Sequence, residues 1–68
     1  MRYAVVVEQA DRSFGAYVPD LPGCVAAGAS REEVLALMRE AIDLHLQALR
    51  EKGELVPAPT STTEYVEV

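Results

Sequence analysis

The spacing of apolar positions changes several times along the chain, and each change predicts a new structural element. The stretch Arg2–Glu8 carries Tyr3 and the three consecutive valines Val5–Val7, and aromatic and β-branched residues of this kind favour a strand. A polar turn follows at residues 11–13. Phe14–Val18 then predicts a second strand, paired antiparallel with the first because the connection between them is short.

The segment Pro19–Gly23 is the least regular part of the chain. Its two prolines fix φ and remove two backbone donors, and Gly23 can supply a positive φ. The second strand must therefore end here and turn. Residues 24–28 are small and predict a short third strand.

The stretch Arg31–Lys52 carries apolar residues at helical spacing. Ser30 is a favourable N-cap, Glu33 completes the Ser-x-x-Glu capping box, and Gly53 fits the position just beyond the helix end. The apolar residues cover an arc of roughly 200°, wider than the ~100° stripe that packing on one sheet face requires. The sequence therefore predicts one long amphipathic helix with apolar surface to spare.

The residues after the helix predict a return to the sheet. Pro57 and Pro59 make a stiff connection, and Thr62–Val68 predicts a fourth strand, parallel to its neighbour because a helix connects them. The pattern as a whole predicts one α+β domain over residues 1–68. Its order is β-β-β-α-β, a small mixed sheet with one amphipathic helix on one face.

A single helix leaves the second face of such a sheet uncovered. Val5 and Val7 are expected to point to the face opposite Val6 and to form an apolar patch there. A chain of 68 residues also buries only about 60% of its unfolded surface, so a second chain would supplement a small core. We therefore predict a homodimer or higher homo-oligomer, with Tyr3, Val5, Val7 and His45 in its interface.

Charge and composition narrow the class of partner. Half of the residues are apolar and a quarter are charged, which is typical of a folded globule. The chain has 11 acidic and 6 basic residues, a net charge of −5, which disfavours nucleic acid and suits a basic protein partner. No signal peptide or apolar run of ~18 residues is present, so we expect a cytoplasmic chain without membrane contact.

A few side chains are candidates for carrying chemistry. His45 is the only candidate general base, but no spacing gives it an oriented partner, so a hydrogen-bonded core or interface histidine is favoured. Cys24 is interpreted as a packed thiol and not as a nucleophile. Asp20 with Glu8 or Asp11 is a weak nuclease candidate; an Asx-type turn at Asp20 is favoured. The sequence predicts a protein that is not an enzyme, with no catalytic residue, metal or cofactor.

The loop after the second strand is the predicted surface for contact with another protein. Its prolines make it rigid, which lowers the entropy cost of docking, and Tyr17 is a suitable anchor. A purely structural turn is the equal alternative. The acidic helix positions are either a solvated face or a second docking site. The predicted partner-binding residues are Tyr17, Pro19, Asp20, Leu21, Pro22 and Gly23.

Four segments together resemble the HicB antitoxin family: Tyr17–Cys24, Gly28–Ser30, Glu40–Leu46 and Gly53–Pro59. The resemblance implies a partly degraded ribonuclease-H-like fold, found as a homodimer or larger assembly. It also implies neutralisation of HicA, a small basic toxin ribonuclease that cleaves mRNA, by covering the toxin's active surface. Many members carry an added DNA-binding module. Residues 1–68 hold none, so no DNA binding is expected of this chain alone.

The hypothesis that follows is a HicB-like antitoxin, or a binding protein derived from one, acting as a homo-oligomer. The alternative is a stand-alone structural or regulatory homo-oligomer with no toxin partner. A small RNA- or DNA-processing enzyme that depends on Asp20 is a second alternative.

Overall fold

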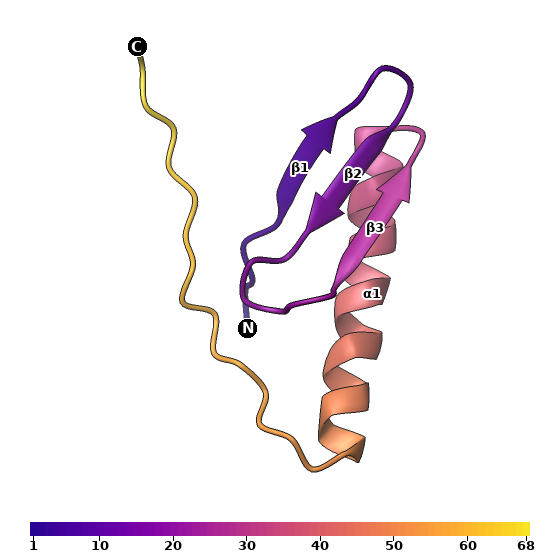
Figure 1. Cartoon of the computed structure of the whole chain (residues 1–68), viewed down its shortest axis with the longest axis vertical. Coiled ribbons are helices and arrows are strands. Elements are labelled where there is room, and N and C mark those ends of the chain that lie inside the picture. The colour runs from indigo at the N-terminus through magenta and orange to yellow at the C-terminus, as the bar shows by residue number, and fades with distance from the viewer.

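The computed structural model describes all of residues 1–68 as a short sheet, one long helix and an extended C-terminal segment (Figure 1). The elements are β1 (Val6–Gln9), β2 (Phe14–Tyr17), β3 (Val25–Gly28) and α1 (Arg31–Glu51). The strand order is β1-β2-β3, and both pairings are antiparallel. The predicted α+β class, with one helix over a short sheet, is confirmed.

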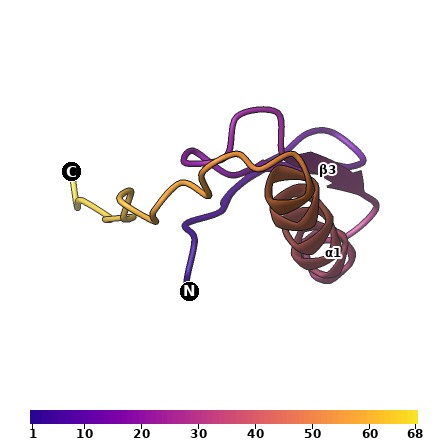
Figure 2. The same cartoon turned by 90° about the horizontal axis from the view of Figure 1, so that it is seen from below.

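The pairing register assigns each strand residue to a face of the sheet. Val7 pairs with Ala16, which pairs with Ala26, and Ala16 is buried, so this row faces α1. Figure 2 shows α1 on one side of the sheet only. The adjacent row, Val6, Tyr17 and Val25, lies on the opposite face, which no element of the chain covers.

Val5 and Val7 do lie on the face opposite Val6, but the expectation that this face is uncovered was wrong. Tyr3, Val5 and Val7 are half-buried and pack against the core, on the side of the sheet that α1 covers. Three consecutive valines show no alternation, so β1 by itself does not reveal which of its faces is inside. Their role in an oligomer interface stays a prediction.

The core is built from β2, the loop after it and one stripe of α1. Only three helix residues are buried, whereas Leu35, Leu37 and Leu44 keep 39%, 38% and 64% of their surface exposed. The helix therefore has more apolar surface than this sheet can cover, as expected from its sequence. The buried residues are Ala16, Val18, Leu21, Cys24, Val34, Met38 and Leu46.

The start of α1 is capped as predicted, with one difference. The Ser30 hydroxyl accepts a hydrogen bond from the Glu33 N–H (3.1 Å), which satisfies one of the free donors of the first turn. The Glu33 carboxylate accepts from the N–H of Ala29 (3.3 Å), where a capping box would use the N–H of Ser30. The backbone N–H and the carboxylate of Glu33 thus both hydrogen-bond to the residues that precede the helix.

The helix stops because Gly53 adopts a positive φ of 73°. The N–H of Gly53 donates to the Arg50 carbonyl (3.1 Å), and the N–H of Glu54 donates to the Leu49 carbonyl (2.9 Å). This pair of bonds is the Schellman arrangement, which satisfies carbonyls that the helix leaves free. The chain is turned sharply back along the molecule.

The fourth strand predicted over Thr62–Val68 does not form. The segment is extended, but it makes no hydrogen bond, so the sheet is antiparallel with three strands and not mixed with four. Its residues suit a strand, but a strand also requires a neighbouring backbone within hydrogen-bonding distance. The likeness to ribonuclease H stays a prediction.

Candidate partner-binding surface

The loop between β2 and β3 is held rigid by its own backbone. The N–H of Val18 donates to the Cys24 carbonyl (3.2 Å), Leu21 donates to Val18 (3.1 Å), and Cys24 donates to Leu21 (3.0 Å). Gly23 has φ 85°, a conformation that permits the last turn. Pro19 therefore lies on the outside of a well-defined double turn that connects the two strands.

Leu21 points inward from this loop and is fully buried in the core. It cannot contact a partner unless the loop rearranges, so it fastens the loop to the body. Pro19, Pro22 and Gly23 are exposed, and Tyr17 beside them keeps 41% of its surface exposed. Four of the six predicted contact residues are thus available to another protein.

Asp20 is engaged inside the chain. Its Oδ2 accepts the backbone N–H groups of Thr60 (3.0 Å) and Ser61 (2.9 Å), and its Oδ1 accepts their two hydroxyls (3.1 and 2.8 Å). These bonds, those from Ser61 first, hold the pKa of the Asp20 carboxyl below its ordinary value of 3.8. The expected Asx-type bond to nearby backbone was wrong, because the donors lie forty residues away.

A second contact fastens the same C-terminal segment. The Tyr3 hydroxyl donates to the Pro57 carbonyl oxygen, and Val56 packs against the core. We call residues 54–61 the strap, because contacts at Val56, Pro57, Thr60 and Ser61 tie it to the body. We call the unbonded residues 62–68 the tail.

The uncovered side of the sheet, which we call the open face, consists of Val6, Tyr17 and Val25 with Gly15 and Ala27 beside them. Val25 keeps 65% of its surface exposed, and the glycine and alanine leave the area flat. A contiguous exposed apolar patch of this kind is typical of an interface. The sequence does not single out Val6 and Val25, although the two-residue period of paired strands places both beside Tyr17.

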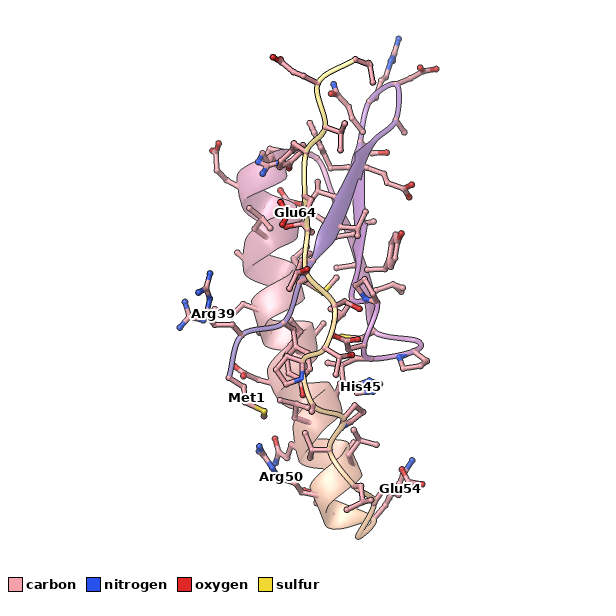
Figure 3. The ribbon with its side chains drawn as sticks, turned by 90° about the vertical axis from the view of Figure 1, so that its left-hand side faces the viewer. Met1, Arg39, His45, Arg50, Glu54 and Glu64 are labelled. Atoms are coloured by element: carbon pink, nitrogen blue, oxygen red, sulfur yellow. The ribbon has the colours of Figure 1, made fainter.

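His45 lies half-buried in the middle of α1 and makes no hydrogen bond with the protein. Figure 3 shows it pointing to the sheet side of α1, whereas Arg39 and Arg50 point away. The expected bond to a carbonyl or neighbouring side chain is not formed.

Cys24 is packed in the core with 3% of its surface exposed. Burial raises the pKa of its thiol, which keeps the sulfur protonated and poorly nucleophilic. This agrees with its interpretation as a packed small hydrophobe. No group of three or more histidine, cysteine, aspartate or glutamate side chains comes together in a way that could hold a metal ion.

These features define a small α+β domain with one open apolar face. Residues 3–68 match the family described as the HicB-like antitoxin of bacterial toxin-antitoxin systems, and the chain belongs to that family. α1 lacks the combination of length and apolar character that a membrane-crossing helix requires.

Several proteins are similar over most of this chain. It is 36% identical to a UPF0150 protein of Archaeoglobus fulgidus over 82% of this chain and 86% of that protein, and 33% identical to a UPF0150 protein of Thermoplasma acidophilum over 84% of each. It is 30% identical to an uncharacterized 14.9 kDa protein of Haemophilus phage HP1 over 97% of this chain, which spans half of the phage protein. No solved structure was found to match.

Proposed function

We propose that this chain is an antitoxin that neutralises a small basic ribonuclease toxin by protein–protein contact, without catalysis of its own. The observation that carries the proposal is the open face, an uncovered apolar surface in a member of an antitoxin family. The proposal includes a cytoplasmic location, where the RNA substrates of such a toxin are found.

The open face has the composition of an interface centre. Tyr17 is a large, rigid side chain flanked in its row by two β-branched residues, Val6 and Val25. Tyrosines at the centre of an interface often supply a large part of the binding energy. A specific interface buries about 800 Å² on each partner, so the neighbouring loop with Pro19 and Pro22 would complete the contact.

The charge of the chain favours a basic partner. The net charge is −5, and Glu8 lies on the open face itself, in the row next to Tyr17. The acidic residues of α1 are exposed and lie away from the helix stripe that packs on the sheet, so they act by long-range attraction. The exposed acids of the helix are Glu32, Glu33, Glu40, Asp43 and Glu51.

The test is co-expression with the product of a neighbouring short basic reading frame, followed by an RNA-cleavage assay on the purified toxin. The wild-type chain should form a stable complex and suppress cleavage. Val25→Arg should abolish inhibition, because it places a cation in the open face against a basic partner, and Tyr17→Ala should weaken binding about tenfold or more.

The matched control is Leu44→Arg, which adds the same charge at an equally exposed position on α1, 64% exposed against 65% for Val25. It should inhibit as well as wild type. Equal inhibition by Val25→Arg would remove the open face from the proposal. Absence of any RNA-cleaving partner would leave the stand-alone regulatory homo-oligomer as the better description.

A further inference from the structure

The tail has the sequence of a strand but none of a strand's contacts. Thr62–Val68 makes no hydrogen bond with the rest of the chain, and every residue in it is exposed. Tyr65 and Val66 keep 97% and 81% of their surface exposed. Aromatic and β-branched residues so exposed, on an unpaired backbone, are typical of a segment that completes its contacts with another chain.

The outer edge of β1 carries matching unpaired backbone groups. The N–H of Ala10 bonds to the Ser13 carbonyl (2.9 Å), which closes the β1–β2 hairpin. Because hydrogen-bonded pairs alternate along an antiparallel ladder, Glu8 and Val6 bond to β2, and the backbone groups of Val7 and Val5 point outward. No strand lies on that side of β1.

A groove separates this edge from the tail. One part, about 400 Å³, lies between Val5–Val7 and Thr62–Tyr65. It continues as a space of about 370 Å³ between Arg2–Ala4 and the segment around Pro59 and Ser61–Thr63. Figure 1 shows the tail running beside β1 in the same direction, without joining the sheet. The groove thus has extended backbone with free hydrogen-bonding groups on both sides.

We propose that this groove receives the tail of a second copy of the chain, and that the exchange is reciprocal. The incoming tail forms a strand between β1 and the tail of the host copy. With a two-fold axis between the copies, four neighbouring strands follow one another across the sheet. They are β1 of the host, the tail of the second copy, the tail of the host and β1 of the second copy. The β1 edge of each copy is then paired within one continuous sheet, and only the two β3 edges remain at its ends.

Charge favours an antiparallel entry, which the two-fold axis also requires. The β1 side of the groove has Arg2 at one end and Glu8 at the other. The tail begins with two threonines and carries its acids, Glu64 and Glu67, further along. An antiparallel tail brings those acids toward Arg2, whereas a parallel tail would bring Glu67 toward Glu8.

The strap holds the tail in position for this exchange. The contacts of Asp20 with Thr60 and Ser61, and of Tyr3 with Pro57, fix the chain up to the residue before the tail. A segment whose root is fixed loses less freedom when it binds. In this proposal the hydrogen bonds of Asp20 to Thr60 and Ser61 hold the start of the tail beside the groove.

The test compares two proline substitutions in the same extended segment by sedimentation equilibrium at micromolar concentration. Val66→Pro removes an N–H inside the proposed strand, which has neighbours on both sides and needs every donor. Ala58→Pro is the control, because Ala58 is exposed, makes no hydrogen bond and lies outside the tail. Neither change removes a contact of the single chain, so circular dichroism should show the same fold in both.

The wild type and Ala58→Pro should be dimers and Val66→Pro a monomer. Hydrogen exchange should show the Val5 and Val7 amides protected in the two dimers and unprotected in Val66→Pro. A monomeric wild type would overturn the proposal. If the Val5 and Val7 amides were then protected, the tail would pair with β1 of its own chain. If they were unprotected, the edge of β1 would be unpaired. A Val66→Pro variant that remains dimeric would overturn it too, because the interface would then lie elsewhere, for example on the open face.

Discussion

At the scale of single residues, Asp20 determines where the C-terminal segment leaves the folded body. Both oxygens of its ionised carboxylate accept hydrogen bonds from Thr60 and Ser61. Oδ2 accepts from their two backbone N–H groups, and Oδ1 accepts from their two hydroxyls. Hydrogen bonds to a charged acceptor are stronger than bonds to a neutral one. The lowered pKa of Asp20 reports the same preference for the ionised form.

The fastening by Asp20 should depend on pH in a definite direction. Since its pKa in the folded chain lies below 3.8, its contribution to stability is fully present above that value and is lost as the pH falls through the folded pKa. Carboxyl NMR titration should find Asp20 ionising below pH 3.8. Asp20→Ala removes both acceptor oxygens and should remove exchange protection from the Thr60 and Ser61 amides at pH 7.

The control is Asp11→Ala, because Asp11 is exposed and its side chain makes no hydrogen bond. It should leave both amides protected. Two results would show that the carboxylate does not hold the strap. One is an Asp20 carboxyl that titrates at or above pH 3.8. The other is unchanged exchange protection of the Thr60 and Ser61 amides when Asp20 is replaced.

The residue-scale features that sequence reasoning found are those with local causes. The turn at Pro19–Gly23 and the packed thiol of Cys24 follow from residue types and their immediate neighbours. The bonds of Asp20 to Thr60 and Ser61 join positions forty residues apart and depend on where the strap crosses the loop. No local pattern around Asp20 carries that information.

At the scale of elements, the same distinction separates α1 from the strands. The helix carries its own start, periodicity and stop, so its bounds were predicted to within one residue. The face of β1 was assigned wrongly because Val5–Val7 are apolar on both sides, and only pairing with Ala16 reveals the inner one. The tail has strand propensity, but its pairing partner is not fixed by its own residues.

The contribution of the Ser30 N-cap to the stability of the fold can be measured. Ser30→Ala removes the acceptor of the Glu33 N–H and should lower the free energy of unfolding by about 1 kcal/mol. Urea denaturation followed by circular dichroism measures the difference. Ser13→Ala is the control, because the Ser13 hydroxyl makes no hydrogen bond, and it should stay within about 0.5 kcal/mol of wild type. Equal stability of Ser30→Ala would mean that Glu33 and Ala29 suffice to hold the helix start.

At the scale of the whole molecule, a small core coexists with several uncovered apolar surfaces. Seven of 68 residues are buried, while the open face, the flank of α1 around Leu37 and Leu44, and the tail remain accessible. These surfaces lie on different sides of the chain, so two partners could bind together. The tail exchange and toxin contact proposed above use separate surfaces, the β1 edge and the open face.

The net charge of −5 should affect how fast a basic partner is bound more than how long it stays. Surface charges attract over about 10 Å at 0.1 M salt and over only about 3 Å at 1 M, so the association rate with the toxin should fall as salt rises. Reversing Glu40 and Asp43 to lysine on the exposed side of α1 should slow association and leave the dissociation rate nearly unchanged. Tyr17→Ala should do the opposite, because it removes a direct contact and leaves the charge intact. Stopped-flow binding at two salt concentrations separates the two effects, and an association rate that ignores both salt and the lysine substitutions would mean that charge does not guide this encounter.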